Sequence, residues 1–167
     1  MKASTKFRIE PATEKDVPVI LSLIKGLAEY ERLSHEIMTT EASLRESLFG
    51  SRRVAEVILG YAGTEAVGFA VFFHNYSTFL GRPGIYLEDL FVAPQWRRRG
   101  LGTQLLCNIA QQAVERGCGR LEWAVLDWNE PAIAFYKKLG ARAMDEWTVY
   151  RVTGNALEKL ASGKAPK

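Results

Sequence analysis

Three consecutive arginines, Arg97, Arg98 and Arg99, precede the run Gly100, Leu101, Gly102 and Thr103 near the middle of the chain. An apolar run that ends at Val92 comes before them, and a helical pattern begins near Leu101. Glycine lets the backbone approach a ligand closely, successive N–H groups can converge on anionic oxygens, and the following helix presents its positive N-terminal end. This pattern is typical of a loop that binds pyrophosphate.

Other phosphate-binding loops do not fit this sequence. A P-loop needs four residues between its first glycine and Gly-Lys-Ser/Thr, and that spacing is missing around Gly100. A dinucleotide-binding fingerprint would need a glycine at position 105, which is leucine. A solvated basic turn before a helix remains the alternative on this pattern alone.

A second group that could take part in catalysis or binding is the acidic pair Glu88 and Asp89, which interrupts the apolar run 85–92. A buried strand rarely carries two adjacent carboxylates without a reason. Because side chains alternate along a strand, we expect Asp89 to face away from Glu88 and to make a structural hydrogen bond.

The composition is that of a soluble globular protein. The 167 residues are 47% hydrophobic and 25% charged, and the net charge is +3, or +1 without Lys164 and Lys167. That charge is too small to indicate general binding of nucleic acid. No apolar run approaches the roughly 18 residues of a membrane span, and the N-terminus lacks an apolar signal core, so we expect a cytoplasmic protein that binds no membrane. The two cysteines are expected to be free thiols, and the histidines have no partners at metal-ligand spacing, so no metal is expected.

Hydrophobic periodicity and turn residues predict the elements that position these groups. Strands are expected at 6–10, 54–62, 66–76, 85–92, 121–128 and 147–152, and helices at 17–32, 40–50, 100–116, 129–140 and 155–160, with a loop at 77–84. This order indicates a single α/β domain over 1–161, with a mixed sheet flanked by helices, followed by a polar tail over 162–167.

Three segments together resemble the GNAT superfamily of acetyl-CoA-dependent N-acetyltransferases. They are the run Tyr86 to Val92, the arginine-glycine loop, and the run Trp128 to Gly140. More narrowly, Leu87-Glu88-Asp89-x-Phe91-Val92 and Trp128-Asn129-Glu130-Pro131, with Pro11-Ala12-Thr13 and Glu29-Tyr30-Glu31, resemble the diamine (spermidine/spermine or thialysine) acetyltransferase branch. The resemblance implies a mostly antiparallel GNAT sheet and a homodimer.

The resemblance also implies which residues bind acetyl-CoA. Backbone groups of Leu90, Phe91 and Val92 would bind the pantetheine arm, and Arg97, Arg98, Arg99, Gly100, Leu101, Gly102 and Thr103 the pyrophosphate. Asn129, Glu130, Pro131 and Ala132 would border the donor, with Tyr136 close to the sulfur. A tyrosine, with a reference pKa of about 10, suits the protonation of a departing thiolate.

The acceptor would be a primary amine, whose reference pKa of about 10.4 makes the neutral form cost roughly 4.6 kcal/mol at pH 7. Glu88 is the expected base, directly or through water, or else an anchor for the cation. Attack would be direct, in a ternary complex. The residues expected to bind the amine are Tyr30, Glu31, Glu88, Glu122, Trp123, Ala124 and Trp128.

The identity of the amine stays open at this point. The segment 32–36 is less acidic than a polyamine site would favour, and Arg82 borders the loop 77–84, so a thialysine-like amino acid competes with a polyamine. A peptide or protein amine is a second alternative, and a non-catalytic acyl-CoA-binding module is a third.

Overall fold

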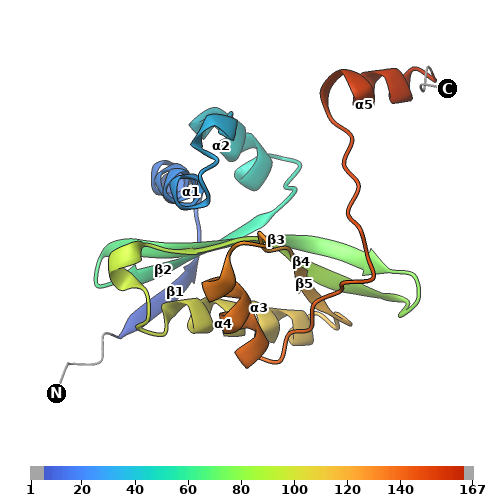
Figure 1. Cartoon of the computed structure of the whole chain (residues 1–167). Helices are drawn as coiled ribbons and strands as arrows, with labels where there is room; N and C mark the ends of the chain where they lie inside the picture. The colour runs from blue at the N-terminus through green and yellow to red at the C-terminus, as the bar shows by residue number, and fades with distance from the viewer. Residues whose placement is uncertain (1–5, 164–167) are drawn as a thin grey trace. The chain divides into compact units, whose positions relative to one another are not determined.

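A five-stranded sheet forms the centre of the fold in the computed structural model, which describes residues 6–163. The strands are β1 (Phe7–Pro11), β2 (Glu56–Ala62), β3 (Glu65–Ser77), β4 (Arg82–Val92) and β5 (Leu121–Trp123). They lie in the order β1-β2-β3-β4-β5 (Figure 1). The first four pair antiparallel and β5 joins β4 in parallel, so the expected mixed, mostly antiparallel sheet is confirmed.

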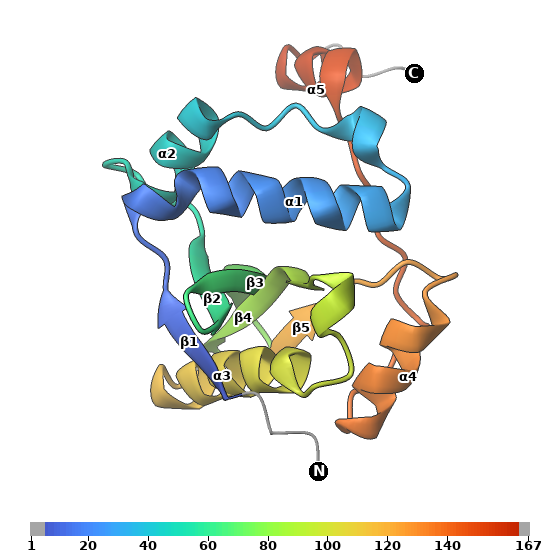
Figure 2. The same ribbon diagram turned by 90° about the vertical axis from the view of Figure 1, so that its left-hand side faces the viewer.

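Five helices accompany the sheet in the described part of the chain. They are α1 (Val17–Glu31), α2 (Glu41–Phe49), α3 (Leu101–Glu115), α4 (Glu130–Lys138) and α5 (Gly154–Ala161). Helices α1 and α2 cover one face of the sheet and α3 covers the other (Figure 1, Figure 2). None of the helices within residues 6–163 has the length and apolar character needed to cross a bilayer.

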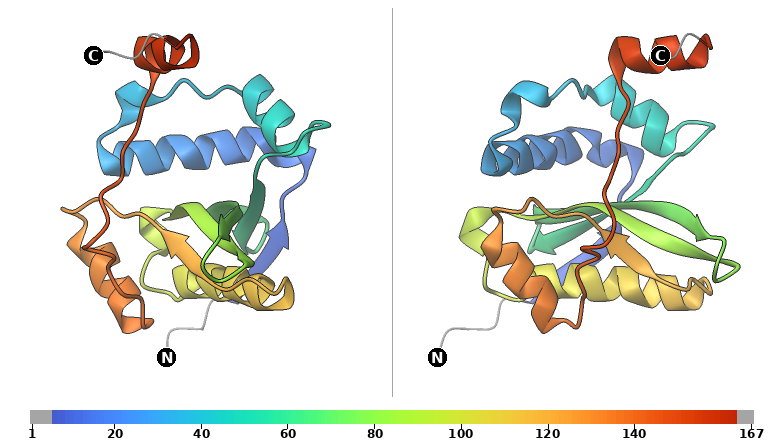
Figure 3. Two further views of the ribbon diagram at one scale, coloured as in Figure 1. Left: turned by 90° about the vertical axis from the view of Figure 1, so that its right-hand side faces the viewer. Right: turned by 45° about the vertical axis from the view of Figure 1, so that its right-hand side comes forward.

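Contacts divide the chain into two compact units, Met1–Ala124 and Val125–Lys167. The first unit holds the whole sheet with α1, α2 and α3. The second holds α4, α5 and the extended segment that joins them (Figure 3). The polar tail expected over 162–167 lies outside the described residues from 164 onward.

Local capping sets where the helices begin. The backbone N–H of Thr13 donates to Asp16 Oδ2 at 2.7 Å in the capping box of the short 3-10 turn Glu14–Asp16, which leads into α1. Pro18 stands in the first turn of α1, where it costs no helical hydrogen bond. The Oγ1 of Thr40 accepts from the N–H of Ser43 at 3.1 Å and begins α2.

The main core lies between α1, α2 and one face of the sheet. It contains Val17, Ile20, Leu23 and Leu27 from α1, Leu44 and Leu48 from α2, and Val57, Leu59, Phe69 and Phe91 from the strands. These residues share one face because strand side chains alternate and helical ones recur every three to four positions. Burial of this set holds α1 against β3 and β4, the strands that carry the candidate site.

Three sequence expectations are corrected. Strand β4 begins at Arg82, so the loop expected over 77–84 shrinks to residues 78–81 between two paired strands. Strand β5 ends at Trp123, five residues early. Residues 147–152 form no strand, although they are rich in aromatic and β-branched residues. A strand requires a hydrogen-bonded neighbour, and this segment pairs with none in the part of the chain that the structure describes.

Candidate active site

The arginine-glycine loop has a backbone suited to an anion. Arg98 and Gly100 both adopt the left-handed conformation, with φ of 60° and 92°. Gly100 is the N-cap residue of the 15-residue helix α3, so it offers no side chain to the first N–H groups of that helix. Alternating conformations of this kind turn successive N–H groups toward one point. The loop therefore fits the pyrophosphate group that the sequence predicts.

The start of α3 is held against the sheet by close contact with two glycines. Gly60 and Gly68 are paired across β2 and β3, and a Cβ added at Gly60 would lie 2.7 Å from Leu101 Cδ1. Leu101 is 1% exposed. The absence of side chains at these two positions lets the first residue of α3 pack directly on the strands, which fixes the height of the loop above the sheet.

Within residues 6–163, the last residues of β4 have a strand partner on one side only. Leu90, Phe91 and Val92 pair with β3, whereas β5 pairs only with Ile85, Tyr86 and Leu87. Within the described chain, strand pairing on the β5 side of β4 therefore stops at Leu87. Backbone N–H and C=O groups need partners. The Val92 carbonyl oxygen accepts from Arg97 Nε–H, and the other backbone groups that residues 90–92 present away from β3 suit the hydrogen bonds expected to the pantetheine arm.

Glu88 lies at an irregularity in the sheet. Asp89 pairs with Val71 and Leu87 with Phe72, so the register shifts and Glu88 has no direct counterpart on β3. A bulge of this kind breaks the alternation of side chains. Alternation alone therefore cannot assign opposite faces to the two carboxylates, as the sequence analysis assumed. Glu88 is exposed, whereas Asp89 is largely buried.

Asp89 belongs to an acidic group on the α1 face of the sheet. Its counterpart Val71 packs beside the core cluster that contains Phe91 and α1. Burial, followed by the negative charges of Glu88 and Glu31, raises the pKa of Asp89 to about 6. Burial also raises the pKa of Glu31, in the last turn of α1. The group favours a bound cation, because a positive charge would stabilise the ionised carboxylates.

Tyr30, beside Glu31 in the last turn of α1, contacts the first arginine of the loop. The guanidinium carbon of Arg97 lies 4.2 Å from the centre of the Tyr30 ring and 5.5 Å from that of Phe91. Its Nε–H also donates to the carbonyl oxygen of Val92 at 2.9 Å. Arg99 instead stacks on Trp96 at 4.8 Å. The three arginines therefore have different surroundings.

Glu122, expected to bind the amine, has partners of its own. Its Oε2 accepts from Asn75 Nδ2 at 2.8 Å and lies 2.8 Å from Arg120 Nε. These contacts compensate its charge and join β5 to β3. Trp123 is partly buried at the end of β5, and Ala124, the last residue of the first unit, is exposed.

The remaining expected residues belong to the second unit. Asn129 is buried, and its Oδ1 accepts from the N–H of Ala132 at 3.4 Å, so it caps α4 as the sequence indicates. Glu130 and Pro131 form the first turn. Tyr136 is partly buried in α4, with its ring 5.2 Å from that of Phe135. Trp128 is half exposed just before the helix.

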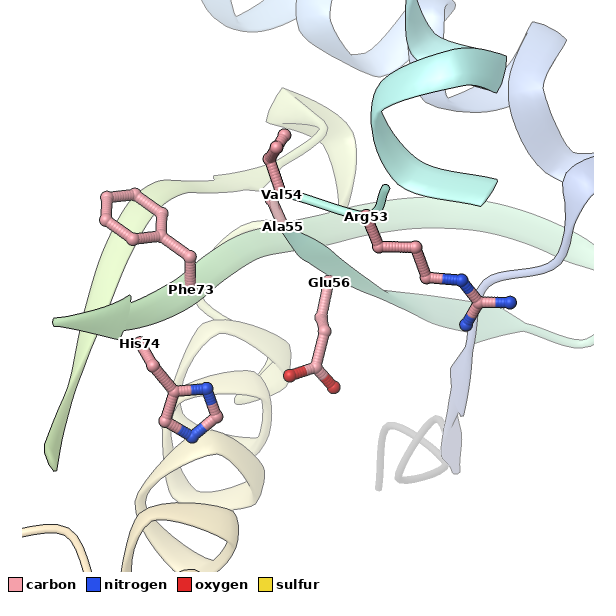
Figure 4. Close-up of a pocket in the computed structure, with 6 residues that line it drawn as sticks. All are labelled: Arg53, Val54, Ala55, Glu56, Phe73 and His74. Carbon is pink, nitrogen blue, oxygen red and sulfur yellow. The ribbon is translucent and has the colours of Figure 1, made fainter. Parts of the chain in front are cut away.

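A pocket of about 440 Å³ lies elsewhere, at the edge of β2 and β3. Its lining consists of Arg53, Val54, Ala55, Glu56, Phe73 and His74 (Figure 4). None of these six is an expected site residue, and Glu56 is engaged in an ion pair with Arg116. Among residues 6–163, no three His, Cys, Asp or Glu side chains gather as metal ligands.

Two features of the site were not anticipated from the sequence. Asp89, which was expected to make a structural hydrogen bond, lies near the charges of Glu88 and Glu31, and the adjacent carboxylates in the sequence were a signal for both positions. The contact of Arg97 with Tyr30 joins positions 67 residues apart, and no local pattern announces it.

Two known acetyltransferases are similar to most of this chain. Thialysine N-epsilon-acetyltransferase of Mus musculus is 39% identical over 165 residues, covering 92% of this chain and 96% of that protein. L-ornithine N5-acetyltransferase NATA1 of Arabidopsis thaliana is 35% identical, covering 92% and 87%.

Solved structures share the fold. An integron cassette protein from the mobile metagenome of V. cholerae superimposes with a TM-score of 0.78 at 28% identity, covering 93% of this chain and 97% of that one. An aminoglycoside acetyltransferase from an uncultured soil sample gives a TM-score of 0.76 at 20% identity, covering 89% and 97%, which is a likeness of fold alone.

The acetyltransferase (GNAT) family itself matches residues 24–141, which include the C-terminal half of α1, the sheet from β2 onward, the arginine-glycine loop and α4. The resemblance to the thialysine and diamine branch is confirmed by the relatives above. Family membership implies acetyl-CoA as the acetyl donor. This chain belongs to the acetyltransferase (GNAT) family.

Proposed function

We propose that this enzyme transfers an acetyl group from acetyl-CoA to the terminal side-chain amine of a small amino acid of the thialysine or ornithine type. Relatives with these activities in their names match more than nine-tenths of the chain. The basic residue Arg32, which directly follows Glu31 at the C-terminus of α1, also disfavours a long polycation.

The observation that carries this proposal is the acidic group formed by Glu31, Glu88 and Asp89. Two of its members have a pKa raised by burial, so ionising them without a counter-charge costs free energy. An ammonium group next to Asp89 would offset that cost. The group lies beside the end of β4, where residues 90–92 have backbone available for the donor.

The residues that would hold the donor are those of the loop 97–103 and the end of β4. Acetyl-CoA supplies a thioester, whose carbonyl carbon is open to attack by an amine. The N–H groups at the start of α3 would bind the pyrophosphate, and backbone groups of Leu90 to Val92 would orient the pantetheine arm. These contacts hold the two reactants together in one complex.

Glu88 would receive the proton of the ammonium group, directly or through water, or would anchor the cation while water receives it. The amine nitrogen then bonds to the acetyl carbon as the carbon–sulfur bond breaks. Tyr136 would donate its phenolic proton to the departing sulfur, and the second proton that the nitrogen loses on forming the amide would restore the phenol, directly or through water. We expect Tyr136→Phe to lower kcat by about 100-fold or more, measured with saturating substrates, because general acid catalysis contributes on that scale.

The resemblance that supports this activity also supports a homodimer that works in the cytoplasm, and a single acetyltransferase domain over 1–161. We include these three features in the proposal. The extended segment of the second unit, with exposed Trp147, Val149 and Tyr150, offers apolar surface for a partner copy.

The test is a screen of thiol release from acetyl-CoA over thialysine, ornithine, lysine, putrescine, spermidine and a lysine peptide. We expect kcat/KM for thialysine and ornithine to exceed that for spermidine by at least about tenfold. A preference for the peptide would replace the proposal with protein acetylation. Acetyl-CoA binding without turnover of any amine would indicate a non-catalytic acyl-CoA-binding module.

The same screen with Asp89→Asn tests the acidic group. We expect the amine KM to rise about tenfold or more with little change in the acetyl-CoA KM, since a buried charge-assisted contact is lost. Asp145→Asn, at an exposed aspartate of the second unit, is the matched control. An unchanged amine KM in Asp89→Asn would remove this residue from the acceptor site.

A further inference from the structure

Arg97 makes contacts that differ from those expected of a phosphate ligand. Its side chain turns back along the chain, and its Nε–H donates to the Val92 carbonyl oxygen at 2.9 Å. Its guanidinium group stacks on Tyr30, 4.2 Å from the ring centre, and lies 5.5 Å from the Phe91 ring. The charge of Arg97 is therefore held beside the last turn of α1.

The other two arginines of the loop have no such contact with α1. Arg98 is exposed, with its backbone in the left-handed region, and Arg99 is exposed and stacks on Trp96 within the loop itself. Arg97 is the partly buried member of the three. Cation–π stacking and a hydrogen bond from a charged donor both favour one fixed position of its side chain.

The two segments that Arg97 connects have different roles in the proposed reaction. Val92 ends the stretch of β4 whose backbone would orient the donor. Tyr30 is followed by Glu31, a member of the acidic group that would bind the amine. The two segments are far apart in sequence, and Tyr30 packs against the core cluster that contains Phe91, the neighbour of Val92 in β4.

We infer that Arg97 is a positioning residue that holds the acceptor-binding end of α1 in register with the donor-binding end of β4, and that its side chain does not serve the pyrophosphate. This inference rests on the proposed function for its catalytic consequence. Its structural part, the coupling of Tyr30 to Arg97, stands independently of any substrate.

The first experiment compares two donors, acetyl-CoA and S-acetylpantetheine, which has the same thioester arm but no pyrophosphate. Arg97→Gln keeps a side-chain N–H donor but loses the charge and the stacked guanidinium. We expect it to lower kcat/KM about tenfold with both donors, because the lost contacts lie between protein groups. In the reference variant Arg98→Gln, the loss with acetyl-CoA should exceed the loss with S-acetylpantetheine.

A loss in Arg97→Gln that is confined to acetyl-CoA would overturn the inference, because it would assign the side chain to the pyrophosphate. The amine KM supplies a second readout, since a phosphate ligand would leave it unchanged. We expect it to rise severalfold in Arg97→Gln and in Tyr30→Leu.

A double-mutant cycle on unfolding separates this inference from the proposed function. Arg97→Gln, Tyr30→Leu and the double variant are unfolded in urea. We expect the pair to be coupled by about three- to fivefold in the unfolding equilibrium constant, the range of an accessible cation–π contact. If the effects of Arg97→Gln and Tyr30→Leu on the free energy of unfolding are simply additive, the inference is overturned even in an active enzyme. Coupling in a protein that acetylates none of the amines would instead leave the contact established and the proposed function wrong.

Discussion

Asp89 shows how a single carboxyl group can link stability to binding. It lies on the α1 face of the sheet, and the charged groups that raise its pKa, Glu88 and Glu31, are themselves acidic. In the free protein its ionisation opposes folding. A bound ammonium group would reverse that effect, so the same residue that weakens the empty protein would strengthen the complex.

Asp89→Asn should change the pH dependence of stability. The pKa of Asp89 is about 6 in the folded protein, above its ordinary value of 3.8, so the folded state holds this proton more tightly. Stability from this group is present below pH 4 and is lost as the pH rises through 6. Between pH 4.5 and 7.5 the variant should gain about 2 kcal/mol relative to the wild type.

Urea unfolding at several pH values measures this difference, with Asp145→Asn as the exposed control. A difference between Asp89→Asn and wild type that stays constant from pH 4.5 to 7.5 would contradict the assignment.

For individual residues, the sequence could predict which side chains are able to take part in catalysis or binding, but not how they are oriented. Glu88 and Asp89 stand out as adjacent carboxylates in an apolar run. The bulge opposite Val71 and Phe72 depends on how two strands align, and one extra residue in β4 changes which face a side chain occupies. Local alternation cannot contain that information.

Among the elements, α3 depends on the glycines beneath it. Gly60→Ala would place a Cβ 2.7 Å from Leu101 Cδ1, in a position where Leu101 is fully buried. We expect a loss of about 1–3 kcal/mol in the free energy of unfolding, the usual cost of an overfilled core. The acetyl-CoA KM should rise as well, because the loop before α3 moves with Leu101.

Combining Gly60→Ala with Leu101→Val tests the cause, since the smaller side chain makes room for the new methyl group. Chemical unfolding and acetyl-CoA titration should both show partial recovery relative to Gly60→Ala. If the double variant loses as much free energy of unfolding as the two single variants together, the contact between position 60 and Leu101 is not the cause of the destabilisation.

Helix positions were accessible from the sequence because their signals are local. Thr40 and Asn129 cap helices, and apolar residues recur at helical spacing through α1 and α3. Strand lengths were not accessible from the sequence, since a strand extends only as far as the neighbouring strand with which it forms hydrogen bonds. For that reason β5 stops at Trp123 and residues 147–152 remain unpaired in the described chain, although both segments have strand-like composition.

For the whole molecule, the proposed homodimer predicts a mass of about twice 18.7 kDa by light scattering. Val149→Asp should shift this mass toward that of the monomer, because a charge in an apolar contact between copies is costly. Val114→Asp, on α3, is the matched control, since the two valines are 83% and 79% exposed. A Val149→Asp protein that keeps the wild-type mass across the concentration range would place the contact elsewhere.

The left-handed backbone of Arg98 has a consequence for how this enzyme responds to selection. A residue with a Cβ at φ 60° carries a conformational cost of about 1 kcal/mol or more that glycine would avoid. Selection for thermal resistance alone would therefore favour Arg98→Gly, whereas selection for turnover would retain the positive charge. Variants gathered under the two pressures should diverge at this position, and heat tolerance gained there should come at the expense of affinity for the acetyl donor.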